Sequence, residues 1–114
     1  MATTYKVLAQ ATPTTSRTSI AAASGDYVVP TATSAVVSTV AITNTTSGSL
    51  NSYVYVVKSA GTSSTSNALV YAAPVAANSI TTITIGITLA TGDALVFGSS
   101  ATGLTIQAFG SEIA

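Results

Sequence analysis

The carboxylates are the first residues to consider, because a pair of them could perform acid–base chemistry on a bound substrate. The chain has three, Asp26, Asp93 and Glu112, and the intervals between them are 67 and 19 residues. Nothing in this spacing predicts that two of them meet. Both aspartates directly follow a glycine, which is typical of turns in which the carboxylate accepts hydrogen bonds from nearby backbone N–H groups. We therefore expect both aspartates to have structural roles in turns.

The chain has no histidine and no cysteine, so imidazole bases, thiolate nucleophiles and the usual ligands of zinc and haem are absent. A serine nucleophile would need Lys6 or Lys58 as its base, but neither Ser-x-x-Lys nor Gly-x-Ser-x-Gly occurs. No glycine-rich stretch is followed by lysine, as a phosphate-binding loop requires. We therefore expect a protein that is not an enzyme, with no catalytic residues, no metal site and no cofactor.

The few cations also restrict the partners. Lys6, Arg17 and Lys58 balance the three acids, giving a formal net charge of zero, and three cations cannot neutralise a run of phosphates. The longest apolar stretch, residues 68–77, is interrupted by Pro74 and is far shorter than the about 20 residues of a membrane-spanning helix. An apolar signal segment behind a basic N-terminus is also missing. We therefore expect neither a nucleic-acid partner nor a membrane partner.

Three tyrosines could form a binding surface. Tyr53 and Tyr55 alternate along one predicted strand and so share a face, and Tyr71 lies on the next strand. Together they could stack against a sugar or contact another protein. The alternative, which is more common, is that they are cross-strand packing residues on a half-buried sheet. We keep Tyr53, Tyr55 and Tyr71 as a possible interaction surface.

These residues must be positioned by strands, because the apolar residues recur with period two and no helical stripe is present. In 35–44 the alternation predicts that Val36 shares a face with Val40 and Ile42, while Val37 lies on the opposite face with Thr39, Ala41 and Thr43. The strands near 50–59 and 104–110 also alternate: Tyr53, Tyr55 and Val57 oppose Val54 and Val56, and Leu104, Ile106 and Ala108 oppose Thr105, Gln107 and Phe109.

Turn residues divide the chain into about eight short strands, which predicts an all-β fold. The expected strands are 5–10, 27–29, 35–44, 50–59, 68–73, 79–89 with a bend at Gly86, 94–99 and 104–110. This spacing is typical of an antiparallel two-sheet β-sandwich, of either the jelly-roll or the immunoglobulin-like type. We expect residues 1–114 to form a single domain, with 11–24, rich in Ala, Ser and Thr, as a loop or an extended arm.

Charge is unusually scarce in this strand-rich chain. Charged residues make up 5% of the sequence, against about 25% in an ordinary globular domain, and serine and threonine together occupy 37 of the 114 positions. Soluble monomers keep their net charge away from zero and use Lys and Glu to block pairing at strand edges. The scarcity of charge therefore favours a protein whose surface is covered by neighbouring molecules in an assembly.

Several strand sequences resemble small virion structural proteins of tailed bacteriophages, especially phages of cyanobacteria and marine bacteria. The similar segments lie at both ends and in the first third of the chain: Met1–Gln10, Tyr27–Pro30, Ser34–Val40, Leu89–Leu95 and Gln107–Ile113. One departure is Ala9, where those proteins have glycine. The segment 11–24 also interrupts the alignment. Neither departure changes the expected fold.

The resemblance implies a virion protein, located on the capsid surface in preference to the tail. Small β-sandwich proteins of this kind decorate capsids as cement, usually as trimers seated over junctions of the major capsid protein. The implied partners are therefore further copies of the chain, as a homotrimer, and the major capsid protein or another virion protein. The alternative is a tail-fibre, baseplate or adaptor component, which could bind a receptor or a glycan through Tyr53, Tyr55 and Tyr71.

Overall fold

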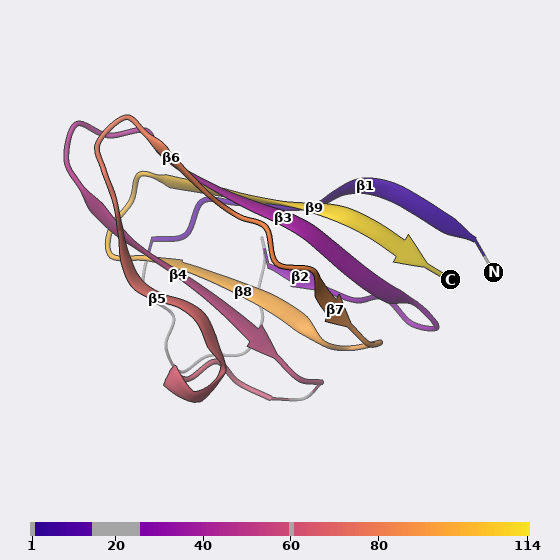
Figure 1. Ribbon diagram of the computed structural model, residues 1–114. Coiled ribbons are helices and arrows are strands. Elements are labelled where there is room, and N and C mark those ends of the chain that lie inside the picture. The colour runs from indigo at the N-terminus through magenta and orange to yellow at the C-terminus, as the bar shows by residue number, and fades with distance from the viewer. Residues whose placement is uncertain (1, 15–25, 60) are drawn as a thin grey trace.

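The computed structural model describes residues 2–14, 26–59 and 61–114, and in these ranges the chain is almost entirely β (Figure 1). One short 3-10 helix, Thr65–Asn67, precedes the fifth strand. The nine strands in the described ranges are β1 (Thr3–Ala11), β2 (Tyr27–Val28), β3 (Ser34–Asn44), β4 (Leu50–Val57), β5 (Ala68–Val75), β6 (Ile80–Ile83), β7 (Ile87–Leu89), β8 (Ala94–Ser99) and β9 (Leu104–Ile113).

All eight expected strands are present, and the expected bend at Gly86 divides one of them into β6 and β7. Gly86 has a φ of 23°, a conformation that side chains other than glycine rarely adopt. The expected turn before β8 is also confirmed. Gly92 has a φ of 85°, and the Asp93 carboxylate accepts hydrogen bonds from the N–H groups of Ala90 at 3.0 Å and Ser59 at 3.1 Å.

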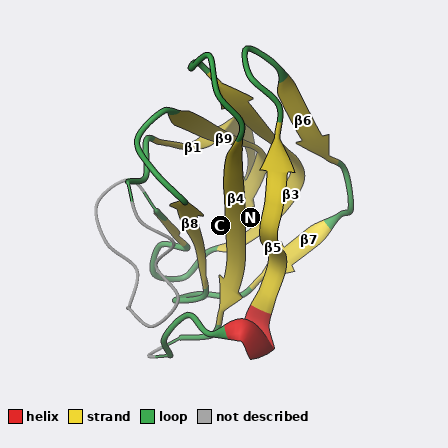
Figure 2. Cartoon of the chain, turned by 90° about the vertical axis from the view of Figure 1, so that its left-hand side faces the viewer, coloured by secondary structure: helices red, strands yellow, loops and turns green. Residues whose placement is uncertain are grey.

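The strands form two sheets that pack face to face, which confirms the two-sheet sandwich (Figures 1 and 2). Sheet 1 has five strands in the order β1-β9-β3-β6, with β7 also paired to β3, and sheet 2 has the order β2-β8-β4-β5. All pairings are antiparallel. The pairing is nested when β6 and β7 are counted as one interrupted strand. The first strand, β1, pairs with the last, β9; β2 pairs with β8, β3 with β6 and β7, and β4 with β5. This is a long hairpin rolled into two layers, so the fold is a jelly roll and not an immunoglobulin-like sandwich.

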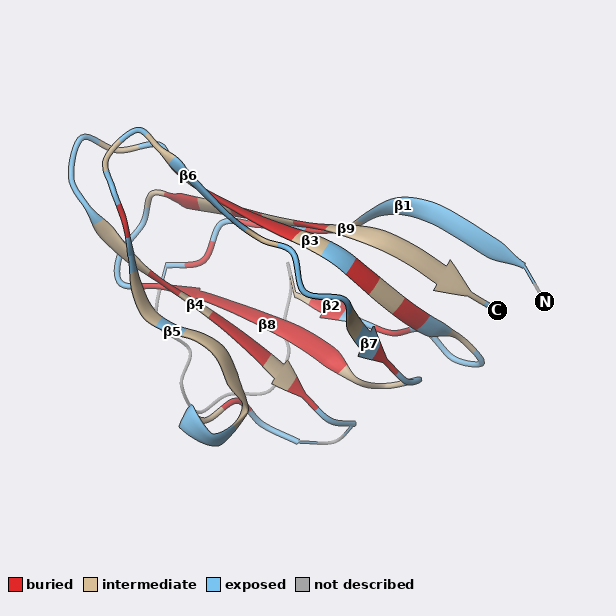
Figure 3. Cartoon of the chain, viewed as in Figure 1, coloured by how far each residue is buried: buried red, intermediate tan, exposed pale blue. Residues whose placement is uncertain are grey.

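The main hydrophobic core lies between the two sheets, where the buried residues are coloured red in Figure 3. Its fully buried members come from both sheets and include Val40, Ile42, Ile106, Val54, Leu95 and Phe97. The alternation predicted for β9 is confirmed, since Leu104, Ile106 and Ala108 are all buried in this core. In β4, Val54 and Val56 both contact this core, which confirms the prediction that they share a face.

The face predicted for Val36 is wrong. Val37 is 0% exposed and belongs to the core with Val40 and Ile42, whereas Val36 is only partly buried. The reason is a β-bulge: the register of β3 against β9 shifts between Val37 and Thr39, so Ser38 is an extra residue. One extra residue reverses the side-chain alternation beyond it, because the period of a strand is two.

A second bulge faces the first across β9. The register of β1 against β9 shifts between Val7 and Ala9, while β3 shifts at Ser38, and both shifts lie opposite Phe109. Next to Phe109, a side chain at Gly110 would collide with the carbonyl oxygen of Val36. Since bulges bend a strand and increase its twist, sheet 1 bends here, and glycine at position 110 permits the close approach of β3.

The segment expected as a loop or arm, 11–24, is described only in part. Ala11 is the last residue of β1, and residues 12–14 belong to no strand. Residues 15–24 lie outside the described residues. Among the described residues, no helix has the length and apolar character needed to cross a membrane.

We predict that Gly110→Ala destabilises the protein, because the new methyl group would overlap the Val36 carbonyl and force β3 and β9 apart. The expected loss in the free energy of unfolding is about 1–3 kcal/mol, the usual cost of overpacking, measured by urea denaturation. Gly48→Ala is the matched control, because nothing lies within 4 Å of a methyl group at that position. Equal stability of the two variants would contradict the close approach at Gly110.

Candidate functional site

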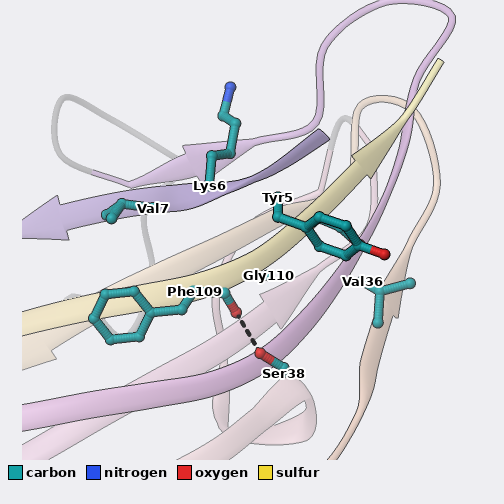
Figure 4. A pocket seen from close by; sticks show the side chains of 8 residues that line it. Tyr5, Lys6, Val7, Val36, Ser38, Phe109 and Gly110 are labelled. Atoms are coloured by element: carbon teal, nitrogen blue, oxygen red, sulfur yellow. Dashed lines mark hydrogen bonds between the residues drawn. The ribbon is translucent and has the colours of Figure 1, made fainter. Parts of the chain in front are cut away.

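A depression of about 560 Å³ lies on the outer face of sheet 1, on the side away from the core. Three strands that are distant in sequence form it: Tyr5 and Val7 come from β1, Val36 from β3 and Phe109 from β9. Figure 4 shows the ring of Tyr5 extending across β9 toward Val36, while Lys6 points away from the depression. The depression is therefore lined mainly by apolar side chains.

The two bulges and one hydrogen bond explain the shape of this depression. The Ser38 hydroxyl donates a hydrogen bond to the carbonyl oxygen of Phe109 at 3.1 Å, which fixes the bulged residue of β3 against β9. Because both neighbours of β9 are bulged beside Phe109, the sheet bends around this point. Bulges are common at sheet edges and beside functional sites, where they change the direction of a side chain.

The two apolar residues that β1 contributes to the depression are unusually exposed, whereas Val36 and Phe109 are partly buried. Tyr5 is 84% exposed and Val7 is 48% exposed, although an aromatic ring gains much more from burial than a polar side chain does. Reasoning from the sequence did not select Tyr5, Val7 or Val36. A signal was present in β9, where Phe109 is a large apolar residue on a face that otherwise carries Thr105, Gln107 and Ser111 before it ends at Ile113.

A polar cluster connects the two sheets beside the depression. Glu112 on β9 accepts hydrogen bonds from the Lys6 ammonium at 3.0 Å and from the Tyr27 hydroxyl at 2.6 Å, and Tyr27 lies on β2 of the opposite sheet. The hydrogen bond from Tyr27, followed by that from Lys6, lowers the pKa of the Glu112 carboxyl. Burial, and secondly the bonded carboxylate, raise the pKa of Tyr27. The cluster therefore favours an ionised Glu112 and a neutral Tyr27.

The three carboxylates serve separate structural contacts. Glu112 belongs to this inter-sheet cluster, Asp93 holds the turn before β8, and Asp26 accepts a hydrogen bond from the N–H of Phe97 at 3.2 Å. The turn expected for Asp93 is confirmed, whereas Asp26 contacts a β8 backbone group far away in sequence. Within the described ranges, no three acidic, histidine or cysteine residues are grouped so that they could hold a metal ion.

The three tyrosines singled out in the sequence do lie together on the outer face of sheet 2. The rings of Tyr53 and Tyr55 are stacked with centroids 6.4 Å apart, and Tyr71 meets Tyr53 edge to face at 5.3 Å. Tyr55 is 0% exposed, and this burial raises its pKa. Tyr71, by contrast, is 52% exposed and Tyr53 is partly buried. An interaction surface here stays a prediction, and its accessible part is Tyr71 with the edge of Tyr53.

Comparisons with known proteins leave the family open. No family of proteins matches the sequence, and no curated protein matches it. Among solved structures, the chain is similar to a protein of the infectious bursal disease virus Gx strain, with a TM-score of 0.49 and 13% sequence identity. The match covers 97% of this chain but 30% of that one. The assignment as a jelly roll rests on the strand pairing described above.

We predict that acid destabilises the protein through Glu112. Its pKa is lower in the folded state than in the unfolded chain, so its contribution to stability is present at neutral pH and is lost as the pH falls from about 5 toward 2. In Glu112→Gln, which keeps an acceptor for the Tyr27 hydroxyl but cannot titrate, the free energy of unfolding should depend less steeply on pH in this range. Urea denaturation at a series of pH values measures the slope, and an unchanged slope would contradict the cluster.

Proposed function

We propose that this protein is a non-enzymatic structural component of a bacteriophage virion, and specifically a decoration or cement protein on the capsid surface. In this role it stabilises the head by bridging subunits of the major capsid protein. The resemblance of its strand sequences to small virion proteins of tailed phages supports this proposal. The arrangement of its charges and apolar residues provides independent physical support.

The observation that carries the proposal is how few charges remain available on the surface. Five charged side chains are described, and four of them are engaged within the fold: Lys6 with Glu112, and Asp26 and Asp93 with backbone N–H groups. Covering a charge by a partner is costly, because it must be removed from water. The outer face of sheet 1, with hydroxyl and apolar side chains around the depression, can be covered without that cost.

The mechanism is mechanical. A jelly roll seated across the contact between two capsid subunits adds buried apolar area, which contributes roughly 25 cal/mol per Å² before the cost of association is subtracted. In a symmetric shell the same contact is repeated at every equivalent position, so a small gain per copy stabilises the whole particle. We propose the depression on sheet 1 as the capsid contact, and a homo-oligomer, on the resemblance a trimer, as the unit that binds.

A tail location with glycan binding is the second candidate, because Tyr71 is half-exposed against the ring of Tyr53. Aromatic rings on a β-sheet face can stack on sugars. This candidate uses sheet 2, on the opposite side of the sandwich from the depression. The two functions therefore depend on different residues and can be separated by mutation.

We predict that cryo-electron microscopy of the phage that encodes this chain will show the jelly roll on the head, over contacts between major capsid subunits. Phe109→Asp should lower the affinity of the chain for the particle roughly tenfold, the equivalent of about 1.4 kcal/mol, and this appears as fewer copies per particle when the chain is supplied below saturation. Thr102→Asp is the control, since it adds the same charge to an exposed turn residue that lies in neither sheet. Density confined to the tail, or absence of the chain from purified particles, would overturn the capsid proposal.

For the second candidate, a glycan array should show binding that is lost in Tyr71→Ala. Removal of the half-exposed ring eliminates the surface on which a sugar would stack. An aromatic contact is worth about 1.5 kcal/mol, so the affinity for the glycan should fall by a factor of about ten or more. Tyr5→Ala is the matched control, because it removes an exposed tyrosine from the other sheet. If no glycan binds, or if both variants lose binding equally, the sugar site at Tyr71 is ruled out.

A further inference from the structure

The outer edges of the two sheets differ in how they are protected against pairing with another strand. The edge strands of sheet 2 are β2 and β5. Strand β2 has only two residues. Strand β5 contains Pro74, its register against β4 shifts, and Ala72 has a left-handed conformation with a φ of 51°. In sheet 1, the edge formed by β6 and β7 is interrupted at Gly86. Shortness, proline and irregularity are all features that prevent edge pairing. Among the described strands, β1 is the edge that has none of them between Thr3 and Val7.

The hydrogen-bond pattern shows which backbone groups of β1 face outward. Ala2 and Ala114 exchange two hydrogen bonds, at 3.0 and 2.9 Å, and residues in an antiparallel ladder alternate between bonded and non-bonded pairs. Thr4 and Lys6, two and four residues further, therefore also direct their N–H and C=O groups toward β9. The intervening residues Thr3, Tyr5 and Val7 direct theirs toward the outer edge, with which no other described strand pairs. A strand added there would find a regular row of donors and acceptors.

The side chains along this edge are suited to pairing. Tyr5 is 84% exposed and Val7 is 48% exposed, and both lie on the outer face. Lys6, the one charged residue of β1, has its ammonium bound to Glu112 at 3.0 Å and points away from that face. The edge therefore presents an aromatic and an aliphatic side chain without an unpaired charge, which is unusual for the edge strand of a soluble protein.

We propose that the open edge of β1 pairs with β1 of a second copy of this chain, antiparallel and about a two-fold axis at Tyr5. In this register Tyr5 lies opposite the partner's Tyr5, and Thr3 lies opposite the partner's Val7. Each of these opposed pairs exchanges two backbone hydrogen bonds. The two copies of sheet 1 become one continuous sheet, and the two depressions lie on the same side of it, next to each other.

A second copy fits this edge because the register is self-complementary. Residues 3 and 7 are equally distant from Tyr5, so one row of outward groups matches an identical row reversed. Lys6 lies opposite the partner's Thr4 and not opposite the partner's Lys6. Because the chain has a formal net charge of zero, two copies do not repel each other as they approach. Such a contact is isologous. It joins copies in pairs, and where the chain also forms trimers it links one trimer to another.

The test compares self-association of the wild-type chain and variants by sedimentation equilibrium over micromolar to millimolar concentrations. Tyr5→Lys places two like charges side by side at the two-fold axis and should weaken the association at least tenfold. Ile80→Lys is the matched control, because it adds the same charge to an exposed residue at the opposite edge of sheet 1, and it should associate as the wild type does.

A charge-swap experiment distinguishes this contact from any other. Tyr5→Glu should also dissociate, whereas an equal mixture of Tyr5→Lys and Tyr5→Glu should recover the association, because opposite charges then meet at the axis. A monomeric wild type, an equal effect of Ile80→Lys, or a mixture that stays dissociated would overturn the proposal. The experiment contains no virion component, so its result is independent of the proposed role in the capsid.

Discussion

The pairing of β9 with both β1 and β3 is the interaction on which the rest of the structure depends. It places the last strand of the described chain between the first and the third, with Thr3 opposite Ile113 on one side and Ser34 opposite Ile113 on the other. These pairings join strands that are far apart in the sequence and so close very long loops of chain. Closing such loops costs conformational entropy, and this cost must be met before the contacts stabilise the fold. Once β9 is in place, it supplies Leu104, Ile106 and Ala108 to the core and Phe109 to the opposite face.

The small number of charges has a structural explanation. Four of the five described charged side chains are engaged within the fold: Lys6 and Glu112 in the cluster that joins the two sheets, Asp93 in the turn before β8, and Asp26 against the backbone of β8. These carboxylates hold turns and neighbouring strands in place through their hydrogen bonds. They contribute little to keeping copies of the protein apart. The same residues that stabilise the fold thus leave its outer faces open to association.

The strands, the bend at Gly86 and the turn at Asp93 could be predicted from the sequence, because alternation and turn residues act locally. The choice between a jelly roll and an immunoglobulin-like sandwich could not, since it depends on which distant strands pair. Val36 was assigned to the wrong face because a bulge at Ser38 leaves no trace in the alternation. The depression was missed for a related reason, because Tyr5, Val36 and Phe109 meet only after β1, β3 and β9 have paired. The tyrosine cluster was found, and the burial of Tyr55 agrees with the packing role that was named as the alternative to a binding surface.

The strand β8 differs from β1 in one further respect. All six of its residues are buried, on both faces of sheet 2, whereas the first five residues of β1 are all exposed. Local unfolding requires least energy where few apolar contacts are broken and where the backbone already faces water. Opening of the N-terminal half of β1 therefore costs less free energy than opening of β8. The edge of the molecule can adjust to a neighbour without loosening its centre.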